Sequence, residues 1–261
     1  MTAKDISKAL RALGSRHIAD TSQRFFKTGP GQYGEGDRFL GIRVPDIRLR
    51  AKAFDPFVSL SETLRLLHSP FHEERLCALL ILVRKYEKGR PEEQQAIFEA
   101  YLENTSAVNN WDLVDLSASQ IVGAHLLNRS AKDLRRLAQS NNLWERRIAV
   151  VATYAFIKNR RYDEILAIAR RLMNDPEDLI HKAAGWMLRE AGKRDVAILR
   201  AFLQEHAQNM PRTMLRYAIE KFPDEERKRY LAMKSSVARR VSGLQAERTD
   251  LRPARGKERK D

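Results

Sequence analysis

A 36-residue spacing between similar segments is the strongest constraint on the fold of this chain. FHEERLCALL at 71–80, LWERRIAVVA at 143–152 and LIHKAAGWML at 179–188 each place two mostly apolar positions before a charged pair and a small or apolar run. Their starts differ by 72 and 36 residues. A common step of 36 residues predicts one more start between the first two, at residue 107, where the sequence reads AVNNWDLVDL. Repeats of this length are typical of stacked helix pairs that bury their apolar faces against neighbouring pairs.

The apolar residues between about 45 and 221 predict helices rather than strands. They recur at spacings of three and four, without sustained alternation of apolar and polar residues. Turn-forming residues interrupt the pattern at close intervals, which indicates short antiparallel helices. We therefore predict an all-α fold, an α-solenoid of antiparallel HEAT-like helix pairs that form a right-handed superhelix with a concave basic groove.

Two segments fall outside the repeat, the C-terminal tail and a glycine-rich stretch near the N-terminus. Residues 1–234 are expected to form one domain, followed over residues 235–261 by a basic tail that is disordered or a frayed helix. Residues 28–44 are rich in glycine and predict a flexible connecting loop. The stretch from Gly29 to Gly34 matches G-x-G-x-x-G, but no predicted strand precedes it and no helix opens directly at its end, so a dinucleotide site is rejected.

The charge balance points to a polyanionic partner. The chain has 48 Lys and Arg against 34 Asp and Glu, a net charge of +14. Nine basic and four acidic residues lie in 231–261, so most of the excess belongs to the folded part. Nucleic acid is the first candidate for such a partner.

Other residues argue against redox, metal and membrane functions. Cys77 is the only cysteine and lies in an apolar run, so neither a disulfide nor a thiolate zinc cluster is expected. His68 and His72 are separated by Pro70, which disrupts a shared helical turn, and we predict no metal and no cofactor. The apolar runs are too short to span a bilayer, and no signal peptide is recognisable. We expect a cytoplasmic protein, associated with the nucleoid when it binds DNA.

The repeat brings four candidate side chains together. Equivalent positions of successive second helices should form a row along the concave surface; these are Arg75, Trp111, Arg147 and Ala183. Asp115 lies one turn after Trp111, and Trp186 lies one turn after Ala183, each on the same face of its helix. Two indoles, a carboxylate and a guanidinium are therefore expected to converge.

Asp115 departs from the repeat, because the equivalent positions hold Leu79 and Val151. A carboxylate beside an apolar face costs stability unless it is paired, and such departures are typical of functional sites. The structural alternative is that Asp115 caps a turn or pairs with Arg147, and that each indole belongs to the core. The convergence of all four groups favours a functional site.

These segments resemble the AlkD-type DNA alkylation repair glycosylases, which are built from HEAT-like repeats. The resemblance covers most of residues 15–225, and it is carried by FLGIRVPDIR at 39–48, NNWDLVD at 109–115, LWERR at 143–147 and HKAAGWMLRE at 181–190. It implies a monomeric, cofactor-free hydrolase that acts on duplex DNA containing alkylated bases. Trp111, Asp115 and Trp186 would line the cleft for the damaged nucleotide, and Arg147 would approach it.

The resemblance also implies contacts outside this cluster. An aromatic residue of the second helix contributes in the family; Phe25 is the match, and Phe26 is the alternative. Further contacts to the substrate or to DNA are expected from the basic residues of the matching segments and the repeat: Arg43, Arg48, Arg75, Arg146 and Arg189.

The implied reaction is hydrolysis of the bond between C1′ and a purine alkylated at N3 or N7. Such a base is cationic and leaves readily, so Asp115 would stabilise an oxocarbenium-like sugar and orient a water molecule. The indoles would offer π faces to the cation, and Arg147 with surrounding basic residues would hold phosphates. The resemblance further implies that the lesion need not enter a deep pocket.

Two other functions are compatible with a basic solenoid. A non-catalytic relative would bind duplex or branched DNA and would not need Asp115. A scaffold would bind acidic protein partners. The presence of Trp111, Asp115 and Trp186 in one chain favours the enzyme over both.

Overall fold

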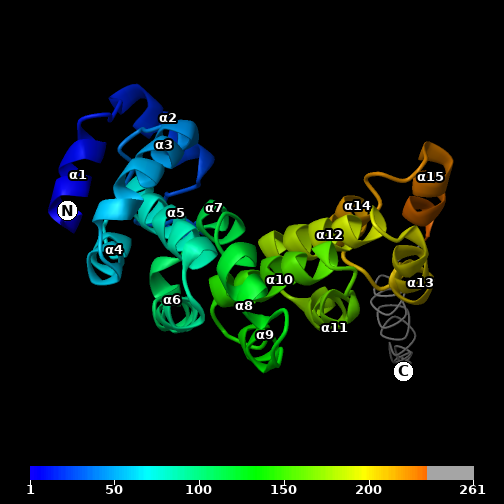
Figure 1. Cartoon of the computed structure of the whole chain (residues 1–261). Helices are drawn as coiled ribbons and strands as arrows, with labels where there is room; N and C mark the ends of the chain where they lie inside the picture. The colour runs from blue at the N-terminus through cyan, green and yellow to red at the C-terminus, as the bar shows by residue number, and fades with distance from the viewer. Residues whose placement is uncertain (234–261) are drawn as a thin grey trace, which may run out of the picture.

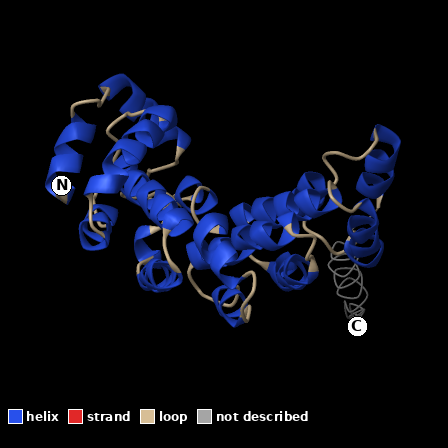
Figure 2. Cartoon of the chain, viewed as in Figure 1, coloured by secondary structure: helices blue, strands red, loops and turns tan. Residues whose placement is uncertain are grey.

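The computed structural model describes residues 1–233, and these residues form an all-helical arc (Figures 1 and 2). Within this range no strand occurs, and one isolated parallel bridge joins Arg38 to Phe71. The prediction of an all-α, solenoid-like fold is confirmed. The predicted tail over 235–261 lies outside the described residues. Among residues 1–233, no helix is both long and apolar enough to cross a membrane.

Helix pairs follow an N-terminal group of three helices. The first group consists of α1 (Ala3–Arg11), α2 (Arg16–Phe25) and α3 (Val44–Phe54). The pairs are α4 (Leu60–Leu67) with α5 (His72–Lys88), α6 (Pro91–Glu103) with α7 (Trp111–Asp115) and α8 (Ala124–Leu126), α9 (Lys132–Leu137) with α10 (Leu143–Lys158), α11 (Asp163–Arg171) with α12 (Asp178–Gly192), and α13 (Val196–His206) with α14 (Arg212–Ala218). The last described helix is α15 (Asp224–Ala232).

Short turns complete the path of the chain. A π-helical turn, Ser119–Gly123, leads into α8, and 3-10 turns occupy Asp55–Phe57, Thr105–Ala107 and Leu172–Asn174. In Figure 1 the helices α4, α6, α9, α11 and α13 follow the lower, convex edge of the arc. Their partners α5, α7, α10, α12 and α14 lie on the inner side, toward the concave face.

The 36-residue register marks the starts of three inner helices. The segments beginning at 71, 143 and 179 coincide with the starts of α5, α10 and α12 to within one residue. The repeat whose predicted start is residue 107 differs, because residue 107 ends a 3-10 turn and α7 begins only at Trp111. The side chain of Asn110 caps this late start by accepting a hydrogen bond from the Trp111 backbone N–H at 2.9 Å. Trp111 is therefore the first residue of its helix, whereas Arg75 and Arg147 lie further inside theirs.

The two longest inner helices form the centre of the core. Every residue from His72 to Val83 of α5, and most residues of α10, are buried, because neighbouring pairs pack on both sides. Cys77 is fully buried in α5, and burial raises the pKa of its thiol to about 12. The cysteine is therefore part of the hydrophobic core.

Close packing of α12 on α14 positions the C-terminal side of the concave face. A methyl group added at Gly185 would lie 2.5 Å from the carbonyl oxygen of Met214 and 2.6 Å from Cβ of Tyr217. The absence of a side chain at Gly185 thus allows the two helices to touch, and it holds Tyr217 against the turn that carries Trp186.

We expect Gly185→Ala to lower the free energy of unfolding by about 1–3 kcal/mol, because the new methyl group overpacks this contact. This loss should appear although alanine favours a helix interior over glycine by about 1 kcal/mol. Chemical denaturation monitored by circular dichroism measures the change. Gly29→Ala is the control, since its added methyl would approach only the flexible end of Gln32, at 3.2 Å. Equal stability of Gly185→Ala and the wild type would contradict the packing argument.

Candidate active site

A cleft of about 490 Å³ opens where α2, α7, α10, α12 and α14 approach one another. It contains all four residues that the sequence brings together: Trp111, Asp115, Arg147 and Trp186. The other lining residues are Phe25, Tyr33, Leu179, Lys182, Arg189 and Tyr217. The cleft therefore combines aromatic walls with one carboxylate and three basic side chains.

Asp115 and Arg147 form a two-point ion pair at the cleft. Nε of Arg147 donates to Oδ1 of Asp115 at 3.0 Å, and Nη2 donates to Oδ2 at 2.8 Å. Nη1 of Arg147 donates to the backbone carbonyl of Leu179 at 2.7 Å, which ties the pair to the start of α12. The Asp115 side chain keeps 16% of its surface exposed, against 6% for Arg147. The carboxylate is thus held in one orientation and remains accessible from the cleft.

The protonation of Asp115 is set by two opposing effects. Burial raises the pKa of its carboxyl group above the ordinary value of 3.8. The charge and the hydrogen bonds of Arg147 lower the pKa but do not cancel the effect of burial, and the charge of Asp112 adds to the rise. Arg147 therefore stabilises a carboxylate in a poorly solvated place.

Two phenylalanine rings pack against the Trp111 indole, one face to face and the other edge to face. Phe26 stacks on the Trp111 indole, with ring centroids 5.1 Å apart, and on Phe39 at 5.0 Å. Phe25 meets Trp111 edge to face at 5.8 Å and is 63% exposed. Of the two candidates at the end of α2, Phe25 therefore lines the cleft, while Phe26, the residue that follows the helix, packs against the face of the indole.

A buried charge cluster fixes the start of α5 against the glycine-rich segment and α7. Nδ1 of His72 donates to Asp37 at 3.1 Å, and Nε2 donates to Asp112 at 2.8 Å. Arg75 pairs with the other oxygen of Asp37, and Asn110 donates to Asp37 at 2.9 Å. We name Asp37, His72, Arg75, Asn110 and Asp112 the α5 charge cluster. It lies beneath the aromatic stack, since the His72 ring also stacks on Phe39 at 4.6 Å.

The surroundings of His72 and Asp37 shift the pKa values of these two groups in opposite directions. Burial alone would lower the pKa of His72, but hydrogen bonds to Asp112 and Asp37 outweigh it and raise the pKa to about 9. Burial alone would raise the pKa of Asp37, but hydrogen bonds from His72 and Asn110 and the charge of Arg75 hold it below 3.8. His72 is therefore an imidazolium between carboxylates at neutral pH.

The Glu73 side chain anchors the segment FLGIRV, residues 39–44, to α5. Its carboxylate accepts hydrogen bonds from the backbone N–H groups of Leu40, Gly41 and Ile42 at 2.8, 2.7 and 3.2 Å. The segment is thereby tied to α5 immediately before α3 begins. Residues 28–44, expected to be a flexible connection, are held at this end by the charge cluster and by Glu73.

The structure separates the predicted DNA-binding arginines into two groups. Arg75 and Arg146 are buried and paired, Arg75 with Asp37 and Arg146 with both oxygens of Asp175. Their guanidinium groups therefore hold parts of the fold together and do not face solvent. Arg147 is likewise engaged by Asp115 and Leu179.

The remaining arginines reach the surface. Arg43 precedes α3 and Arg48 lies on it, and both are exposed. Arg189 is half-buried in the cleft and pairs with Glu220.

Sequence patterns alone missed three polar or aromatic cleft residues, Tyr33, Lys182 and Tyr217. Lys182 and Tyr217 belong to α12 and α14, and Lys182 precedes Trp186 by one helical turn. That spacing places Lys182 on the same face of the helix as Trp186, so it could have identified Lys182 as a cleft residue. Tyr33 comes from the glycine-rich segment, whose path no helical periodicity could predict.

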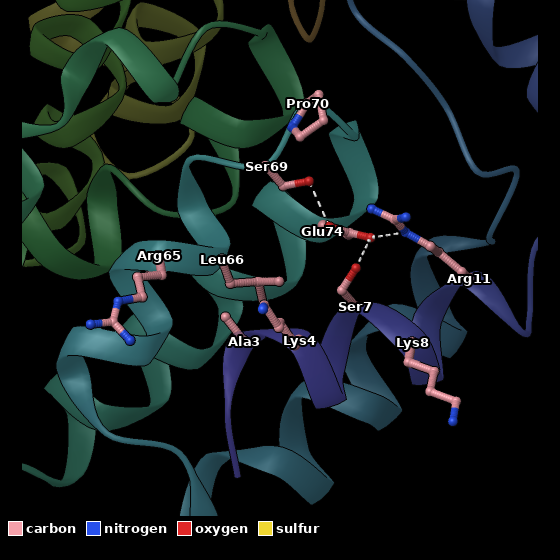
Figure 3. Close-up of a pocket in the computed structure, with 10 residues that line it drawn as sticks. All are labelled: Ala3, Lys4, Ser7, Lys8, Arg11, Arg65, Leu66, Ser69, Pro70 and Glu74. Carbon is pink, nitrogen blue, oxygen red and sulfur yellow. Dashed lines mark hydrogen bonds and ion pairs between the residues drawn. The ribbon is translucent and has the colours of Figure 1, made fainter.

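A second cleft, of about 530 Å³, lies at the N-terminal end between α1 and the α4–α5 connection (Figure 3). Figure 3 shows Ser7, Arg11 and Ser69 converging on Glu74, with distances of 2.7, 3.0 and 2.6 Å to its carboxylate oxygens. Glu74 is 2% exposed and ties α1 to α5. None of the residues predicted for the site lines this cleft.

The fold and the aromatic, carboxylate-bearing cleft define a helical-repeat protein with a candidate active site on its inner helices. The model of the family described as DNA alkylation repair enzyme matches residues 6–222. The chain therefore belongs to the DNA alkylation repair enzyme family, which gives it a role in DNA repair.

A solved structure supports the fold. A protein described as a predicted DNA alkylation repair enzyme from Enterococcus faecalis superimposes with a TM-score of 0.63 at 16% sequence identity. The match covers 81% of this chain and 97% of that one. At this identity the likeness establishes the all-helical architecture. No curated protein matches the sequence significantly.

The raised pKa of His72 predicts a loss of stability at alkaline pH. A group whose pKa is higher in the folded state stabilises the fold fully below its unfolded value, here 6.5, and this stabilisation is lost as the pH rises through about 9. Each unit between the two values corresponds to about 1.4 kcal/mol. We expect the difference in unfolding free energy between the wild type and His72→Gln to shrink between pH 6.5 and 10. Denaturant titrations across this range test it, and a constant difference would contradict a charged His72.

Proposed function

We propose that the protein is a DNA glycosylase that hydrolyses the N-glycosidic bond of purines alkylated at N3 or N7 in duplex DNA. The observation that carries the proposal is the Asp115 carboxylate, oriented by Arg147 and partly exposed in a cleft with aromatic walls. Membership of the DNA alkylation repair enzyme family supports it independently.

Asp115 supplies the negative charge that this reaction needs. The alkylated base carries a positive charge and departs with the electron pair of the C1′–N bond, which leaves an oxocarbenium-like sugar. A carboxylate fixed beside that sugar stabilises it electrostatically, because the fixed group does not have to reorganise during the reaction. Water then forms the new bond to C1′, and its proton passes to Asp115 or to solvent.

Arg147 acts in this proposal as a positioning residue for Asp115. Its two hydrogen bonds to Asp115 fix both oxygens of the carboxylate, and its third, to the Leu179 carbonyl, anchors the guanidinium. Its charge opposes the protonation that burial favours. Three of the five N–H donors of Arg147 are engaged in this way and its side chain is only 6% exposed, so we assign the main contacts to the DNA backbone to other residues.

The aromatic walls suit a cationic nucleotide. Trp111 and Phe25 lie on the α2–α7 side of the cleft, and Trp186 lies on α12. Aromatic faces attract cations at short range, and this attraction strengthens as water is excluded. The walls therefore complement both the alkylated base and the sugar cation.

Exposed basic residues supply the grip on duplex DNA. Arg43 and Arg48 lie at the surface of the α3 region, and Lys182 and Arg189 line the cleft seven residues apart on one face of α12. Together with the net charge of +14, they support a basic concave groove that contacts phosphates without reading the sequence.

Binding to undamaged duplex DNA is expected to weaken steeply with salt. Neutralised phosphates release counterions, so affinity should fall by at least tenfold between about 50 and 200 mM salt, with little dependence on sequence. Fluorescence anisotropy with two unrelated duplexes measures both properties. A flat salt dependence would favour a scaffold for proteins.

Asp115→Asn is expected to reduce release of 3-methyladenine or 7-methylguanine by on the order of 10²-fold or more. Asparagine is similar in size and retains one acceptor for Arg147, but the negative charge is lost. Single-turnover release of the base measures the effect, and binding to the same duplex, measured in parallel, should hardly change.

Asp175→Asn is the matched control. Asp175 forms the same kind of two-point pair with Arg146, at 2.6 and 3.2 Å, and neither residue lines the cleft. This variant should lose stability without losing activity. Equal release by Asp115→Asn and the wild type would remove Asp115 from the mechanism. If the wild type releases no base from any alkylated duplex, a non-catalytic DNA-binding function replaces the proposal.

A further inference from the structure

The second cleft, between α1 and the α4–α5 connection, has a basic rim (Figure 3). The only acidic residue among those described as lining it is Glu74, which is buried and already accepts hydrogen bonds from Ser7, Arg11 and Ser69. Its lining therefore offers no exposed carboxylate. Four basic side chains line the same cleft: Lys4, Lys8, Arg11 and Arg65.

The basic side chains of α1 form a row. Lys4, Lys8 and Arg11 are spaced by four and three residues, so they lie on one face of the helix. At 1.5 Å per residue, this row extends over about 10 Å. Ile6 and Leu10 lie on the opposite face and are fully buried, which holds the helix on the core. The packing of α1 thus directs its cations outward.

A second arginine adjoins this row. Phe71, the residue before α5, carries two guanidinium groups on its ring: Cζ of Arg11 lies 4.7 Å from the ring centroid, and Cζ of Arg38 lies 4.8 Å from it. Nε of Arg11 donates to Glu74 at 3.0 Å, and within residues 1–233 its other nitrogens have no hydrogen-bond partner. Over the same residues, the Arg38 side chain has neither a hydrogen bond nor an ion pair. One ring therefore positions two cations whose donors are mostly unused.

This arrangement suits a phosphate group. Two like charges held beside one ring repel each other, and the repulsion is stronger near a protein surface than in bulk water. An anion bound by both groups would relieve it. Guanidinium groups match phosphate oxygens with pairs of parallel hydrogen bonds. The Arg11 side chain is 52% exposed and Arg38 is exposed, so a phosphate can approach both.

We propose that Lys4, Lys8, Arg11 and Arg38, which we name the N-terminal clamp, bind the phosphate backbone of duplex DNA outside the concave groove. This inference rests on the proposed binding to duplex DNA and is independent of base release.

Two observations favour a DNA backbone over a single phosphate. The α1 row extends over two helical turns, and a DNA strand presents a charge about every 3.4 Å along its axis, so the row can meet more than one phosphate. Arg38 also lies five residues before Arg43, in the stretch that Glu73 ties to α5. The clamp therefore adjoins the exposed arginines of the α3 region.

The test measures how affinity for an undamaged duplex depends on salt in Lys8→Gln/Arg38→Gln. Within residues 1–233 neither side chain has a hydrogen bond or an ion pair, so this variant should fold normally. Arg11 is kept, because its bond to Glu74 also holds α1 on α5. Each phosphate contact contributes about 0.9 to the slope of log affinity against log salt. Loss of two contacts should reduce that slope by about 1.8 and weaken binding equally for unrelated sequences.

Lys132→Gln/Arg136→Gln is the matched control. It removes the same two residue types from α9, on the convex edge of the arc, where both side chains are exposed. Because the net charge falls equally in the two variants, a difference between them reports the position of the charges. The control should keep the wild-type slope.

The outcomes that overturn the inference are distinguishable. Equal slopes for Lys8→Gln/Arg38→Gln and the wild type would remove the clamp, and an equal reduction in the control would assign the effect to overall charge. If both proteins bind duplex alike but only the wild type binds inorganic phosphate or poly-glutamate, the cleft takes another anion. If the wild type binds no duplex, DNA binding fails and the clamp fails with it. A wild type that binds duplex but releases no base would refute the glycosylase function alone.

Discussion

The buried α5 charge cluster is the interaction on which the candidate site depends most. His72, held between Asp37 and Asp112, joins the glycine-rich segment, the start of α5 and the start of α7 at one point. Burial of charged groups costs free energy unless each is paired and hydrogen-bonded. Here two carboxylates face an imidazolium and a guanidinium, so the charges balance. The directional hydrogen bonds of the cluster define how these three segments sit relative to one another.

A continuous stack of aromatic rings connects the charge cluster to the cleft wall. Phe39 stacks on His72, Phe26 stacks on Phe39, and Trp111 stacks on Phe26. Trp111 is thus supported by rings that rest on the charge cluster. On the opposite side, the contact of α12 with α14 at Gly185 places Trp186 near Tyr217. Two independent packing arrangements therefore hold the two walls, and the Asp115–Arg147 pair lies with them in the same cleft.

The ion pairs show why a basic residue in a repeat does not have one fixed role. Arg146 and Arg147 are adjacent in α10, and each forms a two-point pair with an aspartate. The Arg146 pair lies outside the cleft and joins α10 to the turn before α12, whereas the Arg147 pair opens into the cleft. Asp115 therefore fits the structural interpretation, because it pairs with Arg147, and also the functional one, because it lines the candidate site. Only the activity of a charge-neutral variant separates these roles.

The sequence by itself determined the helical class, the starts of α5, α10 and α12, and the convergence of Trp111, Asp115, Arg147 and Trp186. These features follow from local periodicity and from a repeat that places equivalent residues on neighbouring helices. The tertiary structure decided the late start of α7, the burial of Arg75 and Arg146, the choice of Phe25 over Phe26, and the entry of Tyr33 into the cleft. Each of these depends on contacts between residues far apart in the chain, such as Asp37 with His72 and Tyr33 with Trp144. Spacing along one segment carries no information about such contacts, because they are fixed only when the glycine-rich segment packs against α5 and α10.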